Sequence, residues 1–291
     1  MAIKYAIENY LNSDCDLYAS SEFSPYVVEN VYNGRPSKPL RFEGIGVAPG
    51  EVPEWICAEL PYARRPNFTA IFNHNLTVLP NSTDLLMLQA CTLGCPPASG
   101  HCAWDLYSAS GGPGFNLSLA DRIHSDFKNL CSGVFDLGAD YQNFRWAFID
   151  SLNTKAFIEI GEIFLGELKS FSYAKLQPGR KDGPEFFEGT KVTTHGQIWP
   201  AYFGEADGFK IEIINKNSTS QISELRTFLK DVKRAGGKFV FIPNDIHDFC
   251  FYVYLRNMKD FGSQIVKGLD QEFYSWTLDL RTLTEGIALL G

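Results

Sequence analysis

The stretch from Val134 to Gly166 constrains the fold more than any other part of the sequence. It contains two runs in which large apolar residues alternate with other residues, the pattern of a strand with one buried face. The apolar positions are Phe144, Trp146 and Phe148 in the first run, then Ile158, Ile160 and Phe164 in the second. Asp150 to Thr154 supplies a turn between the runs. The stretch therefore predicts a hairpin that closes a β-sandwich domain.

Short apolar segments separated by Gly and Pro precede this hairpin and predict a β-sandwich over residues 14–168. Strands are expected at Trp55–Ala58 and Leu85–Cys91. Phe68–Leu79 is expected to be a strand that ends at a polar break, Asn73–Asn75, and is followed by a second apolar run. Residues 1–13 place apolar side chains at helical spacing, and this segment can equally be an N-terminal arm that docks on a neighbour.

The second half of the chain has a different pattern and predicts a smaller α+β domain at residues 201–291. Residues 169–200 are polar, contain Gly and Pro, and are predicted to be a linker. Apolar residues recur at helical spacing and predict one helix near residues 221–235, with Ser220 as its N-cap and Gly236 as its stop. Strands are expected at Phe209–Ile213, Lys238–Ile242, Phe249–Leu255 and Tyr274–Leu280.

An ordered set of short motifs in the first half resembles the galactose-binding-like, discoidin-type β-sandwich, a jelly-roll fold. The matching segments are Ala70–Leu76, Trp104–Leu106, Phe135–Leu137, Phe144–Trp146 and Ile158–Gly166. The resemblance is to the version of this fold in structural proteins of tailed bacteriophages. It implies a virion component of the tail, baseplate, neck or an appendage, which is not an enzyme and whose partners are other virion proteins and copies of itself.

The same family includes sugar binders whose sites lie in the loops at the strand ends. The second hypothesis is therefore a carbohydrate-binding module that attaches to a host surface glycan. A glycan-processing enzyme is a third hypothesis, with Glu159 and Glu162 as its paired carboxylates. Residues three positions apart on a strand point to opposite faces, so this pair is not expected to act together. No catalytic residue and no cofactor are expected.

Charge and hydropathy limit the other classes of partner. The net charge of −8 argues against nucleic acid, which is bound chiefly by clustered Lys and Arg. The sequence has no signal-peptide core at its N-terminus and no uninterrupted apolar run of about 18 residues, so no membrane insertion is expected. A virion location, after synthesis in the cytoplasm of a bacterial host, follows from the resemblance.

The segment from Cys91 to Gly114 is dense in Gly, Pro, Ser and Cys and predicts a loop. Cys91, Cys95, His101 and Cys102 have side chains that bind zinc, but adjacent residues such as His101 and Cys102 rarely both bind one ion. Two alternatives remain open. Cys91, Cys95 and Cys102 can form a disulfide, within the loop or to another subunit of a particle, or can stay as unpaired thiols.

Two further groups are predicted to lie in contact loops. The first is Asn73, His74 and Asn75, where the histidine either contacts a partner or, as its setting favours, caps a turn. The second is Tyr62, Arg64 and Arg65, which combines aromatic and basic side chains. Together with Arg35, Lys38 and Arg41, the second group is the densest positive region of the sequence, and it suits either an acidic partner or a solvated face.

Overall fold

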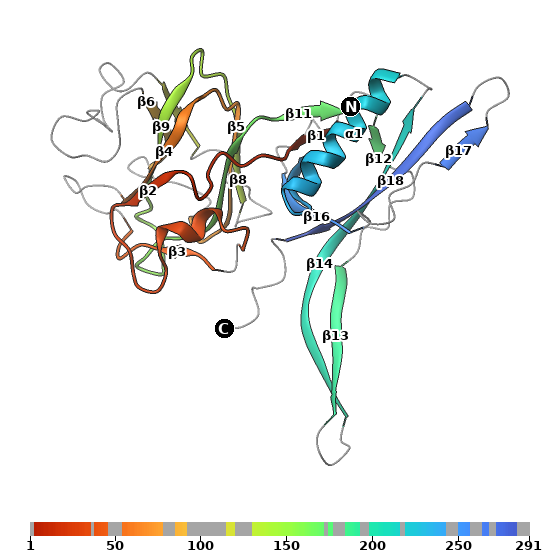
Figure 1. The fold of residues 1–291 in the computed structure, drawn as a ribbon. Helices are drawn as coiled ribbons and strands as arrows, with labels where there is room; N and C mark the ends of the chain where they lie inside the picture. The colour runs from red at the N-terminus through yellow and green to blue at the C-terminus, as the bar shows by residue number, and fades with distance from the viewer. Residues whose placement is uncertain are drawn as a thin grey trace. The chain divides into compact units, whose positions relative to one another are not determined.

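The protein folds into two compact units, Asn9–Leu168 and Met1–Glu8 with Lys169–Gly291 (Figure 1). The computed structural model describes residues 3–35, 38–45, 54–77, 85–91, 115–119, 130–171, 174–176, 184–192, 198–215, 219–242, 250–256, 264–267 and 272–283. The fold is mainly β, with one α-helix in this part of the chain, which confirms the predicted class.

The unit Asn9–Leu168, here called the sandwich unit, consists of two antiparallel sheets. One sheet has the strand order β2–β4–β9–β6–β7 and the other has the order β3–β10–β5–β8. Their strands are β2 (Asp16–Ala19), β3 (Leu40–Arg41), β4 (Glu54–Arg64), β5 (Phe68–His74), β6 (Leu85–Cys91), β7 (Phe115–Ser118), β8 (Leu130–Val134), β9 (Tyr141–Ile149) and β10 (Glu159–Gly166). A short 3-10 helix, η1 (Val28–Tyr32), lies against β10.

The two sheets share one apolar core. Trp146 of β9 is fully buried, and its indole Nε1 donates a hydrogen bond to Thr69 Oγ1 of β5 at 3.3 Å, so this bond joins the two sheets. Phe144 and Phe148 lie in the same core as Ile71 of β5. Burying one such side chain stabilises the folded state by about 1.5–3 kcal/mol. The apolar positions that predicted the sandwich are thus the ones that form its centre.

The predicted hairpin within Val134 to Gly166 is wrong in its strand pairing. β9 pairs with β4 and β6, whereas β10 pairs with β3 and β5. The turn after Asp150 therefore connects one sheet to the other. An alternating pattern identifies which residues of a strand are buried, but it is the same whether the paired strand is near or distant in sequence.

The second unit contains a nine-stranded sheet and the helix. Its main strand order is β11–β1–β15–β16–β18–β14–β12, while β13 pairs with β14 and β17 pairs with β18. The strands are β1 (Ile3–Ala6), β11 (Lys169–Phe171), β12 (Ala174–Leu176), β13 (Pro184–Val192), β14 (Ile198–Asn215), β15 (Lys238–Ile242), β16 (Phe251–Leu255), β17 (Gln264–Lys267) and β18 (Glu272–Thr282). Helix α1 (Thr219–Arg234) packs on this sheet through Leu225, Phe228 and Val232.

Two segments differ from the sequence-based expectation. Residues 1–13 are not one arm, because Ile3–Ala6 pairs with β11 and β15, whereas Tyr10 N donates to Leu165 O of the sandwich unit at 2.7 Å. Residues 169–200, expected to be a linker, contain β11, β12, β13 and the start of β14. Of the Gly and Pro residues in this segment, Pro178, Gly179 and Gly183 lie outside the described residues, and Pro184 begins β13.

Helix α1 confirms the helix predicted near residues 221–235. Gly236 and Gly237 follow its last turn, and their φ angles of 69° and 86° are unfavourable for residues with a side chain. Gly237 N donates to Val232 O at 2.8 Å, which satisfies a carbonyl of the last turn. Ser220, the predicted N-cap, lies inside the first turn. No helix in the described ranges is long and apolar enough to span a membrane.

Candidate functional site

An arginine between aromatic rings lies at one end of the sandwich unit. The group is called the Arg41 cluster and consists of Phe23, Tyr26, Arg41, Lys155, Phe157 and Glu159. The guanidinium carbon of Arg41 lies 4.2 Å from the ring centroid of Tyr26, 4.4 Å from that of Phe157 and 5.9 Å from that of Phe23. Such cation–π contacts fix the guanidinium plane against the rings.

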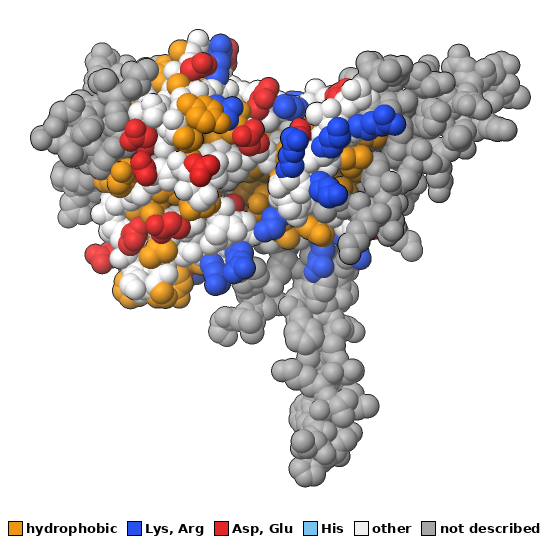
Figure 2. Space-filling model, in the orientation of Figure 1, with side chains coloured by type: hydrophobic (Ala, Val, Ile, Leu, Met, Phe, Trp, Pro, Cys, Tyr) orange, Lys and Arg blue, Asp and Glu red, His pale blue; other side chains and the backbone are white. Residues whose placement is uncertain are grey.

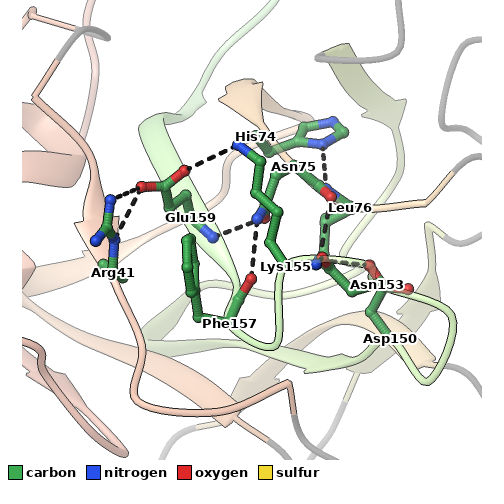
Figure 3. Close-up of polar contacts among 9 residues, drawn as sticks. All are labelled: Arg41, His74, Asn75, Leu76, Asp150, Asn153, Lys155, Phe157 and Glu159. Carbon is green, nitrogen blue, oxygen red and sulfur yellow. Dashed lines mark hydrogen bonds and ion pairs between the residues drawn. The ribbon is translucent and has the colours of Figure 1, made fainter. Parts of the chain in front are cut away.

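A carboxylate fixes the same guanidinium from one edge. Arg41 Nε and Nη2 donate to Glu159 Oε1 at 2.9 and 2.5 Å, and Lys155 Nζ lies 3.8 Å from Glu159 Oε2 (Figure 3). The Arg41 and Glu159 side chains are only 25% and 16% exposed, so water screens this pair less than a pair on the open surface. In the described part of the chain, Arg41 Nη1 makes no hydrogen bond, which leaves its donors available to a ligand.

The loop before β3 places the first two rings. Phe23 N donates to Arg41 O at 2.9 Å, Arg41 N donates to Tyr26 O at 3.3 Å, and Tyr26 N donates to Phe23 O at 2.8 Å. Residues 23–26 therefore form a turn bonded to the backbone of Arg41. Phe23 stays 52% exposed, so part of its ring is accessible to a ligand.

Asn75 places the third ring and the carboxylate. Its Nδ2 donates to Phe157 O at 2.9 Å, and its Oδ1 accepts from Glu159 N at 2.7 Å. His74 beside it is buried, and its Nδ1 accepts from Leu76 N at 3.2 Å, so the imidazole caps the turn. Asn73 has a φ of 53° at the same turn. Asn75 therefore holds Phe157 and Glu159 of the Arg41 cluster, and His74 caps the turn, which is the role that its setting favours.

A buried aspartate fixes the chain between the two sheets. Asp150 accepts hydrogen bonds from Thr77 N at 2.9 Å, Thr77 Oγ1 at 2.5 Å and Asn153 Nδ2 at 3.1 Å. Asn153 Nδ2 also donates to Asn75 O at 3.1 Å. This network joins the turn after β9 to the turn after β5, and both turns support the Arg41 cluster (Figure 3).

The second predicted contact group lies at the opposite end of the strands. The guanidinium carbon of Arg64 lies 4.2 Å from the ring centroid of Tyr62 and 5.0 Å from that of Tyr10, and Arg64 Nη2 donates to the Tyr62 hydroxyl. Tyr62 is 55% exposed. Strand β10 begins at Glu159, beside Arg41, and ends at Gly166, which pairs with Phe68. These two ends of the strand are seven residues and about 23 Å apart. The structure therefore divides the predicted basic region.

Arg65 makes an exposed ion pair next to this group. Its Nη2 lies 2.7 Å from Asp136 Oδ1. The hydrogen bond from Arg65 lowers the pKa of Asp136, and the same bond raises the pKa of Arg65. Because both side chains are largely exposed, this pair adds little to stability.

The carboxylates proposed for catalysis do not converge. Glu159 bonds to Arg41, whereas Glu162 is buried and its Oε2 accepts from Gly34 N at 3.0 Å. Cys91 is disulfide-bonded, so it has no thiolate to offer zinc, and Cys95, His101 and Cys102 lie outside the described residues. Within the described ranges, no group of three or more His, Cys, Asp or Glu side chains could hold a metal ion.

Several solved structures of sugar-binding modules are similar to this chain, at low sequence identity. The family 32 carbohydrate-binding module of NanJ from C. perfringens, solved with galactose, is 14% identical, with a TM-score of 0.36, over 57% of this chain and 99% of that one. The lectin domain of lectinolysin, solved with Lewis B antigen, is 9% identical, with a TM-score of 0.37, over 55% and 96%. A fucose-binding module of Streptococcus pneumoniae is 11% identical, with a TM-score of 0.36, over 54% and 96%.

No protein-family model and no curated protein matches the sequence. Identities and TM-scores at the level of these structures identify neither a ligand nor an activity. The chemistry of the Arg41 cluster is therefore the basis for assigning a function.

Proposed function

We propose that the sandwich unit is a carbohydrate-binding module that holds a sugar at the Arg41 cluster. The observation that supports this most is the fixed position of Arg41 between the rings of Tyr26 and Phe157, on the carboxylate of Glu159 and next to the exposed ring of Phe23. This arrangement places rigid hydrogen-bonding groups beside an exposed apolar surface.

A pyranose ring offers matching chemistry. One of its faces consists mainly of C–H groups, which pack on an aromatic ring, and its rim consists of hydroxyls, which donate and accept hydrogen bonds. Phe23 would hold the C–H face. Arg41 Nη1 would donate to one hydroxyl, and Glu159 Oε2, which lies 3.8 Å from Lys155 Nζ, would accept from another. Because Arg41 and Glu159 are already held by the protein, binding orders few side chains.

The proposed module binds its sugar without hydrolysing a glycosidic bond. Glycoside hydrolysis ordinarily needs two carboxyl groups on either side of the scissile bond. Glu159 of the Arg41 cluster is bound to Arg41, whereas Glu162, outside the cluster, accepts a hydrogen bond from Gly34 N. The cluster therefore suits recognition of a glycan by shape and hydrogen bonding.

A glycan array followed by calorimetric titration tests this function. The wild-type chain is expected to bind one class of glycan, and Phe23→Ala is expected to weaken that binding about tenfold or more, since a ring contact contributes about 0.5–1.5 kcal/mol beyond its buried area. Val134→Ala is a matched control, because Val134 is 49% exposed and lies at the other end of the unit. Wild-type protein that binds no glycan, or Phe23→Ala that binds as wild type does, contradicts the proposal.

A second candidate function is assembly as a structural component of a phage virion. The observation that favours it is a two-stranded ribbon, in which β13 pairs with residues 198–207 of β14, while residues 208–215 of β14 pair with β18. Figure 1 shows this ribbon extending beyond the other strands of its unit. A ribbon of two strands is marginally stable in water, so contact with a partner would stabilise it.

A reconstruction of purified phage particles tests the second candidate. The chain is expected at a fixed copy number, with the β13–β14 ribbon packed on a neighbouring protein. Particles that lack the chain, or that hold it with the ribbon in solvent, contradict the assembly function.

A further inference from the structure

The acidic excess of the chain lies entirely in the sandwich unit. Residues 9–168 contain eighteen Asp and Glu but only nine Lys and Arg, whereas the second unit contains sixteen Asp and Glu and seventeen Lys and Arg. The two units therefore differ in electrostatic character, and an exposed surface of one sign on either unit can attract a surface of the other sign.

Helix α1 has such a surface. Arg226, Lys230 and Lys233 are exposed, and their spacing of four and three residues places them within an arc of about 60° on one flank of the helix. Glu224 and Asp231 lie on the other flank by the same geometry. Figure 2 shows Lys and Arg side chains gathered over this part of the second unit. The three residues are here called the basic flank.

The three cations of the basic flank are not neutralised by ion pairs within the helix. Arg234 lies 3.5 Å from Asp231, whereas none of the three cations of the basic flank makes an ion pair with any described residue. A cation in the last turn interacts favourably with the helix dipole, which accounts for Lys233. Arg226 and Lys230 lie a turn or more before the end of α1, where this effect has faded.

The sandwich unit has a surface of opposite charge. Asp14 precedes β2, Asp16 begins it and Glu29 lies on η1, which packs against β2. All three carboxylates are exposed, and within the described ranges none of them makes an ion pair. Figure 2 shows Asp and Glu side chains gathered over the sandwich unit. These three residues are here called the acidic patch.

Two neighbouring groups feel the carboxylates of the acidic patch. Burial raises the pKa of the Cys15 thiol, and Asp14 and Asp16 raise it further. Burial also raises the pKa of Tyr32, with Glu29 and Cys15 adding to the effect. Because η1 packs against β2, the three carboxylates lie on neighbouring segments of the sandwich unit.

We propose that the basic flank of α1 docks on the acidic patch of a second copy of this chain. One chain supplies both surfaces, each with three charges that lack partners in the described structure. The two surfaces differ, so the contact is head-to-tail and closes into a ring or continues as a filament. This self-association does not depend on the glycan proposal, since the Arg41 cluster shares no residue with either surface.

Analytical ultracentrifugation of the full chain tests the proposal. At about 50 mM NaCl the wild-type protein is expected to self-associate as its concentration rises, and at about 500 mM NaCl screening is expected to abolish the association. The double variants Lys230→Glu/Lys233→Glu and Asp14→Lys/Asp16→Lys are each expected to weaken it at least tenfold. In a mixture of the two variants, the intact acidic patch of one faces the intact basic flank of the other, and the two mutated surfaces also carry opposite charges. A mixed complex is therefore expected.

A matched control separates the specific contact from net charge. Glu224→Lys/Asp231→Lys reverses two charges on the other flank of α1 and is expected to leave self-association unchanged. Circular dichroism and thermal unfolding like those of the wild type are expected to show that all of these variants are folded. Wild-type protein that stays monomeric at low salt, no rescue in the mixture, or a salt effect that is independent of protein concentration overturns the proposal.

Discussion

Replacing Asp150 with Ala should open the sandwich unit at the connection between its two sheets. Asp150 is 3% exposed and accepts three hydrogen bonds, two from Thr77 and one from Asn153. Removing a buried acceptor leaves each donor without its partner, at a cost of about 1–3 kcal/mol for a group that water does not reach. Because Asn153 also bonds to Asn75 O and the turns can relax, a total loss of about 3 kcal/mol is expected.

Hydrogen exchange measured by mass spectrometry reports this loss in the full chain. Peptides that cover β9 and β10 exchange through opening of the sandwich unit, so a loss of about 3 kcal/mol should speed their exchange about a hundredfold. Peptides from α1 and β15 should exchange at the wild-type rate, which makes the second unit an internal control. Asp150→Asn keeps one oxygen acceptor and should give an intermediate rate. A change of less than about threefold for Asp150→Ala would refute the assigned role of this network.

Three further predictions concern other parts of the chain. Trp146→Ala removes the largest side chain of the core and should cost about 3–5 kcal/mol, measured by the same exchange experiment. Gly236→Ala should cost about 1 kcal/mol in thermal unfolding, since a Cβ there meets no atom within 4 Å and only the φ of 69° opposes it. Iodoacetamide should label Cys15 slowly near pH 7 and faster as the pH rises, and Asp14→Asn/Asp16→Asn should move that rise to lower pH. Unchanged stability of Trp146→Ala, or a loss of stability well above the expected value for Gly236→Ala, would contradict the first two predictions. The third would be contradicted if the double variant left the pH dependence of Cys15 labelling unchanged.

The sequence predicts the elements of this fold better than their connections. Alternation at Phe144, Trp146 and Phe148 identifies a buried strand face, and helical spacing at Leu225, Phe228 and Val232 identifies α1, because both patterns are local consequences of which side is buried. Strand partners depend on residues far away in sequence. For this reason the alternating pattern does not show that β9 and β10 belong to different sheets.

The first strand of the chain illustrates the same limit. Ile3–Ala6 has only four residues, too few for a pattern that would indicate its partners. It pairs with β11 and β15, which lie more than 160 residues later. Only the complete sheet shows why the N-terminus belongs to the second unit.

The candidate site was predicted in part. The polar turn at Asn73–Asn75 was identified, but the sequence could not show that Asn75 bonds to Phe157 and Glu159, which are more than 80 residues away. Arg41 and Arg64 are both basic and near in sequence, which suggests one positive region, yet pairing along β10 separates them. Phe23 had no signal as a site residue, since the exposure of one aromatic residue in a loop depends on tertiary packing.

The most direct test of glycan binding at the Arg41 cluster is a crystal structure of the chain with the best glycan from the array. A sugar ring packed on Phe23, with hydroxyls bonded to Arg41 and Glu159, is the predicted result. A sugar bound elsewhere on the sandwich unit, for example at Tyr62 and Arg64, or no bound sugar at saturating concentration, would contradict it.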